Sequence, residues 1–195
     1  MRSILIAAIL ISMISCGGGG STGAVAKLDG YDTSKIGNSN VTVATKKNSG
    51  NELVEKGYLA NGKRNGMWLT YYTGDYAGVI KSITSYSDGM LNGPYVELSN
   101  RGQIDKEVNY AMNEYNGRYV EYKFGRIVKE ANYKGNLLDG ASKDYFQNGK
   151  IQKEINYKGG KQHGLMRYYN EEGKVTVEYQ YENGNKISGG MVEGE

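Results

Sequence analysis

Residues 157–180 read YKGGKQHGLMRYYNEEGKVTVEYQ, and the chain contains several versions of this stretch. A tyrosine begins each version, at positions 86, 110, 133, 157 and 181, so the spacings are 24, 23, 24 and 24 residues. A longer first version covers residues 58–85, and an incomplete last one covers residues 181–195. Such a constant period indicates a repeat protein, and no motif can be interpreted as a site before the repeat is taken into account.

Two glycines recur at fixed offsets within the repeat. One falls seven residues after the tyrosine, at Gly93, Gly117, Gly140 and Gly164, with Gly66 as its counterpart in the first version. The other lies eight residues before the next tyrosine, at Gly78, Gly102, Gly125, Gly149 and Gly173. Because Asn-Gly and Asp-Gly pairs are typical of tight hairpins, we expect both glycines to lie in turns, including Asn92-Gly93 and Asp139-Gly140.

The segments between these glycines have the pattern of strands. In KIQKEINY (150–157), Ile151, Ile155 and Tyr157 fall on one face with Lys153, and polar residues fall on the other. This period of two predicts strands with one packed face. A count of 29 glycines and 18 tyrosines supports a turn-rich sheet. We therefore predict an all-β fold, an elongated antiparallel meander of about five stacked β-hairpin repeats of 23–28 residues.

Four stretches resemble the MORN-repeat superfamily, specifically its type-2 repeats. They are NGKRNGMWLTYY (61–72), DGMLNGPYVEL (88–98), KGNLLDGASKDYFQNGK (134–150) and KGGKQHGLMRYYNEEGK (158–174). Two copies depart from the pattern, with Asn113 at the first glycine position and Ser142 at the usual aromatic position. The resemblance implies a non-catalytic scaffold. Relatives with these repeats are described as antitoxin-like, and MORN repeats are often linked to membranes.

The N-terminal residues resemble a bacterial lipoprotein signal. Arg2 precedes an apolar run from Ile4 to Ile14, too short for the roughly 20 residues of a membrane span, and Met13-Ile14-Ser15-Cys16 resembles a lipobox. We expect residues 1–15 to be a signal peptide and residues 16–50 a lipidated flexible tether, with a repeat domain over residues 51–195. An ordinary signal cleavage site at Cys16 is the alternative. The tether would have a mean reach of roughly 30 Å, and VTVAT (41–45) is a possible edge strand.

The sequence offers little for catalysis. There is no phosphate-binding loop, and one cysteine with one histidine cannot form a Cys/His zinc site. His163 aligns with Asn92, Asn116 and Asp139, so we interpret it as a turn residue rather than a catalytic one. We expect no enzymatic activity, no cofactor and no metal. Acidic and basic residues alternate without a basic block, so we expect no nucleic-acid partner.

Two residue sets could form a binding surface. The glutamates at 107, 130, 154 and 178 should form a column on the face opposite Lys106, Lys129 and Lys153, either as an acidic strip or as ordinary cross-strand pairs. Tyrosines can be core spacers or partner contacts. The candidate binding surface is the set Tyr72, Tyr95, Tyr119 and Tyr168.

These observations favour one function and leave another open. The first is a protein-binding scaffold, antitoxin- or immunity-like by resemblance, anchored to a membrane of the bacterial cell envelope through lipid on Cys16. The alternative is binding of a lipid headgroup or polysaccharide at the same location.

Overall fold

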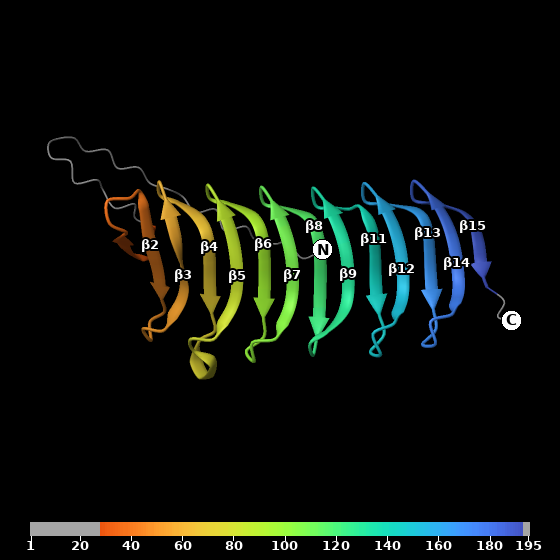
Figure 1. The fold of residues 1–195 in the computed structure, drawn as a ribbon, viewed down its shortest axis with the longest axis horizontal. Coiled ribbons are helices and arrows are strands. Elements are labelled where there is room, and N and C mark those ends of the chain that lie inside the picture. Colours follow the sequence, from red (N-terminus) through yellow and green to blue (C-terminus); the bar gives the residue numbers. More distant parts are fainter. Residues whose placement is uncertain (1–27, 193–195) are drawn as a thin grey trace.

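The computed structural model describes residues 28–192, which form one open antiparallel sheet. Strands follow each other across the sheet in chain order, except that the short β10 pairs with β9 beside β11. Figure 1 shows them standing side by side along the long axis, with the turns gathered at the two long edges. The all-β meander is therefore confirmed. The strand bounds are β1 Asp32–Lys35, β2 Val41–Lys47, β3 Leu53–Ala60, β4 Lys63–Tyr71, β5 Ile80–Ser87, β6 Met90–Leu98, β7 Ile104–Ala111, β8 Glu114–Lys123, β9 Arg126–Lys134, β10 Leu137–Leu138, β11 Gly140–Tyr145, β12 Ile151–Lys158, β13 Lys161–Tyr169, β14 Val175–Glu182 and β15 Asn185–Met191.

The hairpin turns differ between the two edges. Along one edge, two-residue turns have positive φ at both residues, as type I′ turns require. They are Asn61-Gly62, Asp88-Gly89, Met112-Asn113, Gly135-Asn136, Gly159-Gly160 and Asn183-Gly184. Along the other edge the loops contain Gly78, Gly102, Gly125, Gly149 and Gly173, as expected, and they are longer except for Phe124-Gly125, which is again a two-residue turn with positive φ at both residues. The loop after β4 also contains one turn of 3₁₀ helix, η1 (Gly74–Tyr76).

The other repeat glycine does not lie in a turn, and that prediction was wrong. Gly93, Gly117 and Gly164 lie inside β6, β8 and β13, and each has positive φ. His163 likewise lies inside β13. Each glycine faces the repeat tyrosine of the next strand, as in the pair Gly93 and Tyr110. A glycine with positive φ occurs at strand irregularities as well as in turns. The ladder on the other side of each of these strands has such an irregularity, a register shift.

The predicted domain boundary at residue 51 was also wrong. VTVAT does form a strand, β2, but β1 covers its outer side, so β2 is not the edge. Leu28 and Ala44 are buried against Leu59 and Trp68. The sheet therefore includes a segment that its polar, glycine-rich composition had assigned to a tether. Residues 1–27, which contain the expected signal and Cys16, lie outside the described residues.

Arg64 holds this first part of the sheet together. Its guanidinium lies 4.3 Å from the ring centroid of Trp68, and its Nη2 is 2.9 Å from Glu55 Oε1. Arg64 also donates hydrogen bonds to the hydroxyls of Tyr31 and Tyr86, and Tyr31 donates to Glu55. These bonds fasten the chain before β1 to β3, β4 and β5.

Consecutive hairpins are also joined through their turns. In five of the six turns along the first edge, from Asp88-Gly89 to Asn183-Gly184, the second residue donates its N–H to a strand of the preceding hairpin, for example Gly89 to the Arg64 carbonyl at 2.8 Å and Gly184 to the Gln162 carbonyl at 2.8 Å. Asn113 adds its side chain, because its Oδ1 accepts from Leu91 N at 2.7 Å. Neighbour contacts of this kind make the stability of a repeat protein a sum of local terms.

Candidate functional site

The predicted column of glutamates is present, and each of its carboxylates is paired with neighbouring side chains. We call the face that bears Glu107, Glu130, Glu154 and Glu178 the glutamate face. Tyr122, Tyr145 and Tyr169 donate hydroxyl hydrogen bonds to the first three, each glutamate lying fifteen residues before its tyrosine. A basic side chain also lies beside each carboxylate, as listed here: Arg118 for Glu107 and Glu130, Lys143 for Glu154, and Arg167 for Glu178.

This pairing changes the chemistry of the carboxylates. The hydrogen bonds from Tyr145 and then Arg118 lower the pKa of Glu130 below its ordinary value of 4.5. Burial and the same bond raise the pKa of Tyr145 to about 12. Among residues 28–192, no three acidic, histidine or cysteine side chains are grouped as a metal site. Each glutamate is thus satisfied by its own neighbours, as the cross-strand interpretation expected.

The opposite face of the sheet is aromatic. We call it the tyrosine face, defined by Tyr95, Tyr110, Tyr115, Tyr119 and Tyr133. Edge-to-face and tilted ring contacts connect these tyrosines, with centroids 5.1–6.2 Å apart. Beneath them, Val108 and Ala131 are buried. Within the described chain, no second sheet and no long helix covers either face.

The predicted tyrosines do not form one surface. Tyr95 and Tyr119 lie together in the tyrosine cluster, half-buried, with hydroxyls bonded to Glu97 and Glu121. Tyr72 is also half-buried, and its hydroxyl donates to the Leu98 carbonyl at 2.8 Å, which joins the loop after β4 to the end of β6. Tyr168 is 36% exposed, on the tyrosine face but away from the cluster. Tyr72 therefore has a clear packing role, whereas Tyr168 is the most available contact.

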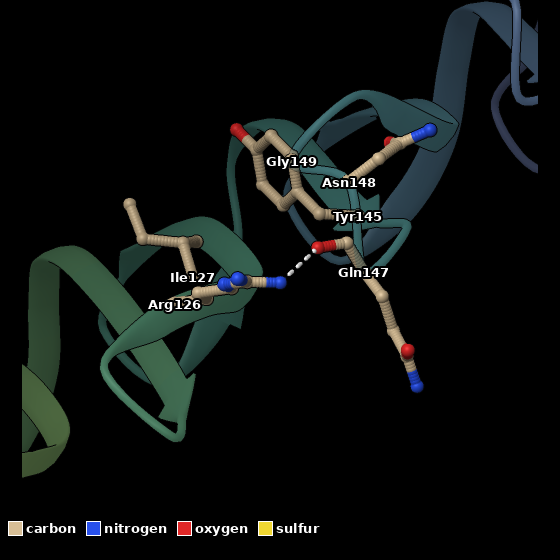
Figure 2. A pocket seen from close by; sticks show the side chains of 6 residues that line it. All are labelled: Arg126, Ile127, Tyr145, Gln147, Asn148 and Gly149. Atoms are coloured by element: carbon tan, nitrogen blue, oxygen red, sulfur yellow. Dashed lines mark hydrogen bonds between the residues drawn. The ribbon is translucent and has the colours of Figure 1, made fainter.

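A cleft lies between two neighbouring loops at the edge that contains Gly125 and Gly149. Figure 2 shows Arg126, at the start of β9, reaching across to the next loop, where its Nη1 donates to the Gln147 carbonyl at 2.9 Å. Two adjoining hollows of about 540 and 400 Å³ are both lined by Arg126, Ile127, Tyr145 and Gln147. The smaller, which we call the tip pocket, is also lined by Lys123, Phe124, Val128 and Phe146.

Sequence reasoning missed this pocket. Phe124 and Phe146 are the only phenylalanines of the chain, and both line it. Phe124 is 84% exposed, the largest aromatic exposure in the described chain. The signal was present, because a phenylalanine directly before a turn glycine is unusual. The candidate binding surface predicted from the repeat contained only tyrosines.

The architecture defines a class, a repeat-based binding scaffold with two open faces. Residues 138–158 and 162–183 match the family model of a MORN repeat variant, so the chain contains repeats of that family. These residues correspond to β10 through β14 and confirm the resemblance for the repeats. No curated protein matches the chain.

Some solved structures are similar to part of the chain. A crystal structure of S. aureus TarM is 14% identical over 56% of this chain with a TM-score of 0.35, and another TarM structure is 13% identical with the same TM-score. A GtfA/B complex is 15% identical over 64% of the chain, with a TM-score of 0.15. The matches span about a fifth of those chains, 21% of each TarM chain and 18% of the GtfA/B chain. Likeness this weak supports no functional argument.

Proposed function

We propose that this protein is a non-catalytic, protein-binding scaffold held at the bacterial cell envelope by lipid on Cys16. The observation that supports it best is the open sheet, whose aromatic face has no covering layer among residues 28–192. Tyrosines are enriched at protein interfaces because they offer large, rigid contacts with a polar end. An antitoxin- or immunity-like role is the finer version of this proposal, and it rests on the family resemblance.

Anchoring would keep the sheet near the membrane. Only eleven residues lie between Cys16 and the buried Leu28, so the path between them is at most roughly 40 Å when fully extended. The β1 end of the sheet would therefore be the membrane-proximal end. No helix within residues 28–192 has the length and apolar character needed to cross a bilayer. Durable attachment would thus depend on the acyl chains.

The anchor and the scaffold need separate tests. Replacing Cys16 with serine should move the full-length protein from the membrane fraction to the soluble fraction, because the lipid has no other attachment residue. Mass spectrometry of the wild-type N-terminus should show acylated cysteine. A Cys16→Ser protein that remains in the membrane fraction, or an unmodified wild-type Cys16, would remove the lipid from the proposal.

Partner binding is tested by crosslinking and pull-down from envelope fractions. We expect one protein to be captured by the wild type and lost with Tyr168→Ala, whereas the control Tyr76→Ala should retain it. Tyr76 is 47% exposed but lies in η1, away from the tyrosine face. Binding of unlipidated residues 28–195 to liposomes or envelope polysaccharide, with no protein captured, would support the alternative function and contradict the scaffold.

A further inference from the structure

The conformation of Phe124 points to a use outside the fold. Its φ is 52°, in the left-handed region that bulky residues rarely adopt, and its ring is 84% exposed. Phe124-Gly125 is a two-residue turn with positive φ at both residues, and the first residue of the corresponding turns on the other edge is Asn61, Asp88, Met112, Gly135, Gly159 or Asn183, none of them aromatic. The phenylalanine adds backbone strain and exposed apolar surface with little packing in return. Strained or exposed residues of this kind are often kept for binding.

The tip pocket combines apolar and basic side chains, and its charge is positive. Phe124, Ile127, Val128 and Phe146 provide the walls, and Lys123 and Arg126 provide two cations. Within residues 28–192 neither cation forms an ion pair, and no carboxylate lines the pocket. Glu130 contacts a lining residue, Tyr145, but it is already bonded to Arg118 as well. The pocket therefore favours an anionic ligand with a large apolar group.

Other ligands fit these walls less well. Attraction to an anionic membrane surface generally uses clusters of 4–8 basic residues, whereas this pocket has two. A sugar would need several polar groups that converge on it. Figure 2 shows the Gln147 side chain extending away from Arg126 and Tyr145. The volume of about 400 Å³ is in the range of pockets that enclose small ligands or anchoring side chains.

We propose that the tip pocket binds an acidic segment of a protein partner. A large apolar side chain of that segment would insert between Phe124, Ile127 and Phe146, and its flanking carboxylates would lie beside Lys123 and Arg126. This proposal rests on the proposed scaffold function and adds a second contact at the loop edge of the sheet. The aromatic anchor would supply most of the affinity, while the two cations would select for acidic sequence.

The test uses a fluorescein-labelled peptide with one tryptophan between two pairs of glutamates, and anisotropy against the full-length protein. We expect Phe124→Asn to weaken binding at least about tenfold, the usual effect of losing a central aromatic anchor. Lys123→Gln should weaken it less and reduce its salt dependence. Asparagine suits left-handed backbone, so Phe124→Asn should not impair folding.

The matched control is Met112→Asn. Met112 is 70% exposed with φ of 48°, at the opposite end of the same strand β8. It should bind the peptide as the wild type does. Equal binding by Phe124→Asn, no binding by the wild type, or equal binding of a peptide with lysines in place of the glutamates would each overturn the proposal. Phe124-dependent binding to anionic vesicles without peptide binding would also overturn it.

The two proposals fail separately. If the peptide is not bound but a partner is still captured in a Tyr168-dependent way, the scaffold function stands and the tip pocket is not its contact. If no protein is captured at all, the scaffold function itself is contradicted.

Discussion

Gly57 lies directly against the indole ring of Trp68. A Cβ atom at this position would overlap Cγ, Cδ2 and Cε2 of that ring, although the backbone of Gly57 is not in the left-handed region. Trp68 is only 1% exposed and cannot move into solvent without leaving the core. The absence of a side chain at Gly57 is therefore what allows the chain's one tryptophan to be buried.

We expect Gly57→Ala to lower the free energy of unfolding by about 1–3 kcal/mol, the usual effect of overpacking a filled site. Urea denaturation followed by Trp68 fluorescence measures this directly. Gly190→Ala is the matched control, since a Cβ at Gly190 meets nothing within 4 Å. An unchanged midpoint for Gly57→Ala would show that the ring is not confined as the structure indicates.

At the turn residue Asn113, two contributions to stability can be measured separately: a side-chain hydrogen bond and the ease of a left-handed backbone. Its φ is 70°, and its Oδ1 accepts from Leu91 N at 2.7 Å in the preceding hairpin. Asn113→Ala should lower the free energy of unfolding by about 1–2 kcal/mol, through lost hydrogen bonding and backbone strain. Asn113→Gly removes only the hydrogen bond and should be less destabilising. Equal losses in both variants, measured by urea denaturation, would assign the whole effect to the hydrogen bond.

At the scale of the strand, the glutamate face shows how neighbouring hairpins satisfy each other. Glu130 on β9 accepts from Tyr145 on β11 and Arg118 on β8, so three strands share one carboxylate. Its folded-state pKa is below 4.5, so its stabilisation is present above pH 4.5 and is lost as the pH falls through the folded-state pKa.

Tyr145→Phe should raise the pKa of Glu130 toward its ordinary value, because the Tyr145 hydroxyl is the largest cause of the shift. The carboxyl resonance of Glu130, followed by NMR against pH, measures the change. Tyr169→Phe is the control, because its hydroxyl serves Glu154 in the next repeat. A pKa of Glu130 that does not change in Tyr145→Phe would assign the shift to the basic neighbours Arg118 and Lys143.

The whole molecule depends on its first two strands more than the repeat pattern suggests. Leu28 and Tyr31, just before β1, and Ala44 on β2 pack with Leu59 and Trp68, and Tyr31 binds Arg64 and Glu55. A fragment of residues 51–195 would expose this core, whereas residues 28–195 would keep it covered. We expect the shorter fragment to unfold at lower urea concentration and its Trp68 emission to be shifted to longer wavelength. Identical emission and midpoints would show that β1 and β2 add no stability.

The period of the tyrosines and glycines was enough to predict the meander, its antiparallel order and the alternation of Glu154 and Lys153 between faces. The alternation of residues along a strand and the residue preferences of turns are local properties. They can therefore be recognised in the sequence without knowledge of the fold. The role of Gly93 could not be read in this way. A glycine at positive φ suits a turn and a strand irregularity equally, and only the ladder with Tyr110 distinguishes the two.

The sequence by itself determined a repeated sheet, because each repeat contains its own turns and alternating strand residues. Tertiary structure decided where the sheet begins, which tyrosines are available and where the tip pocket lies. Leu28 is buried in a cluster with Ala44, Leu59 and Trp68, and Phe124 and Phe146 share one pocket although they are 22 positions apart. Such relations depend on distances between hairpins, and these are set by how the repeats stack rather than by any one repeat.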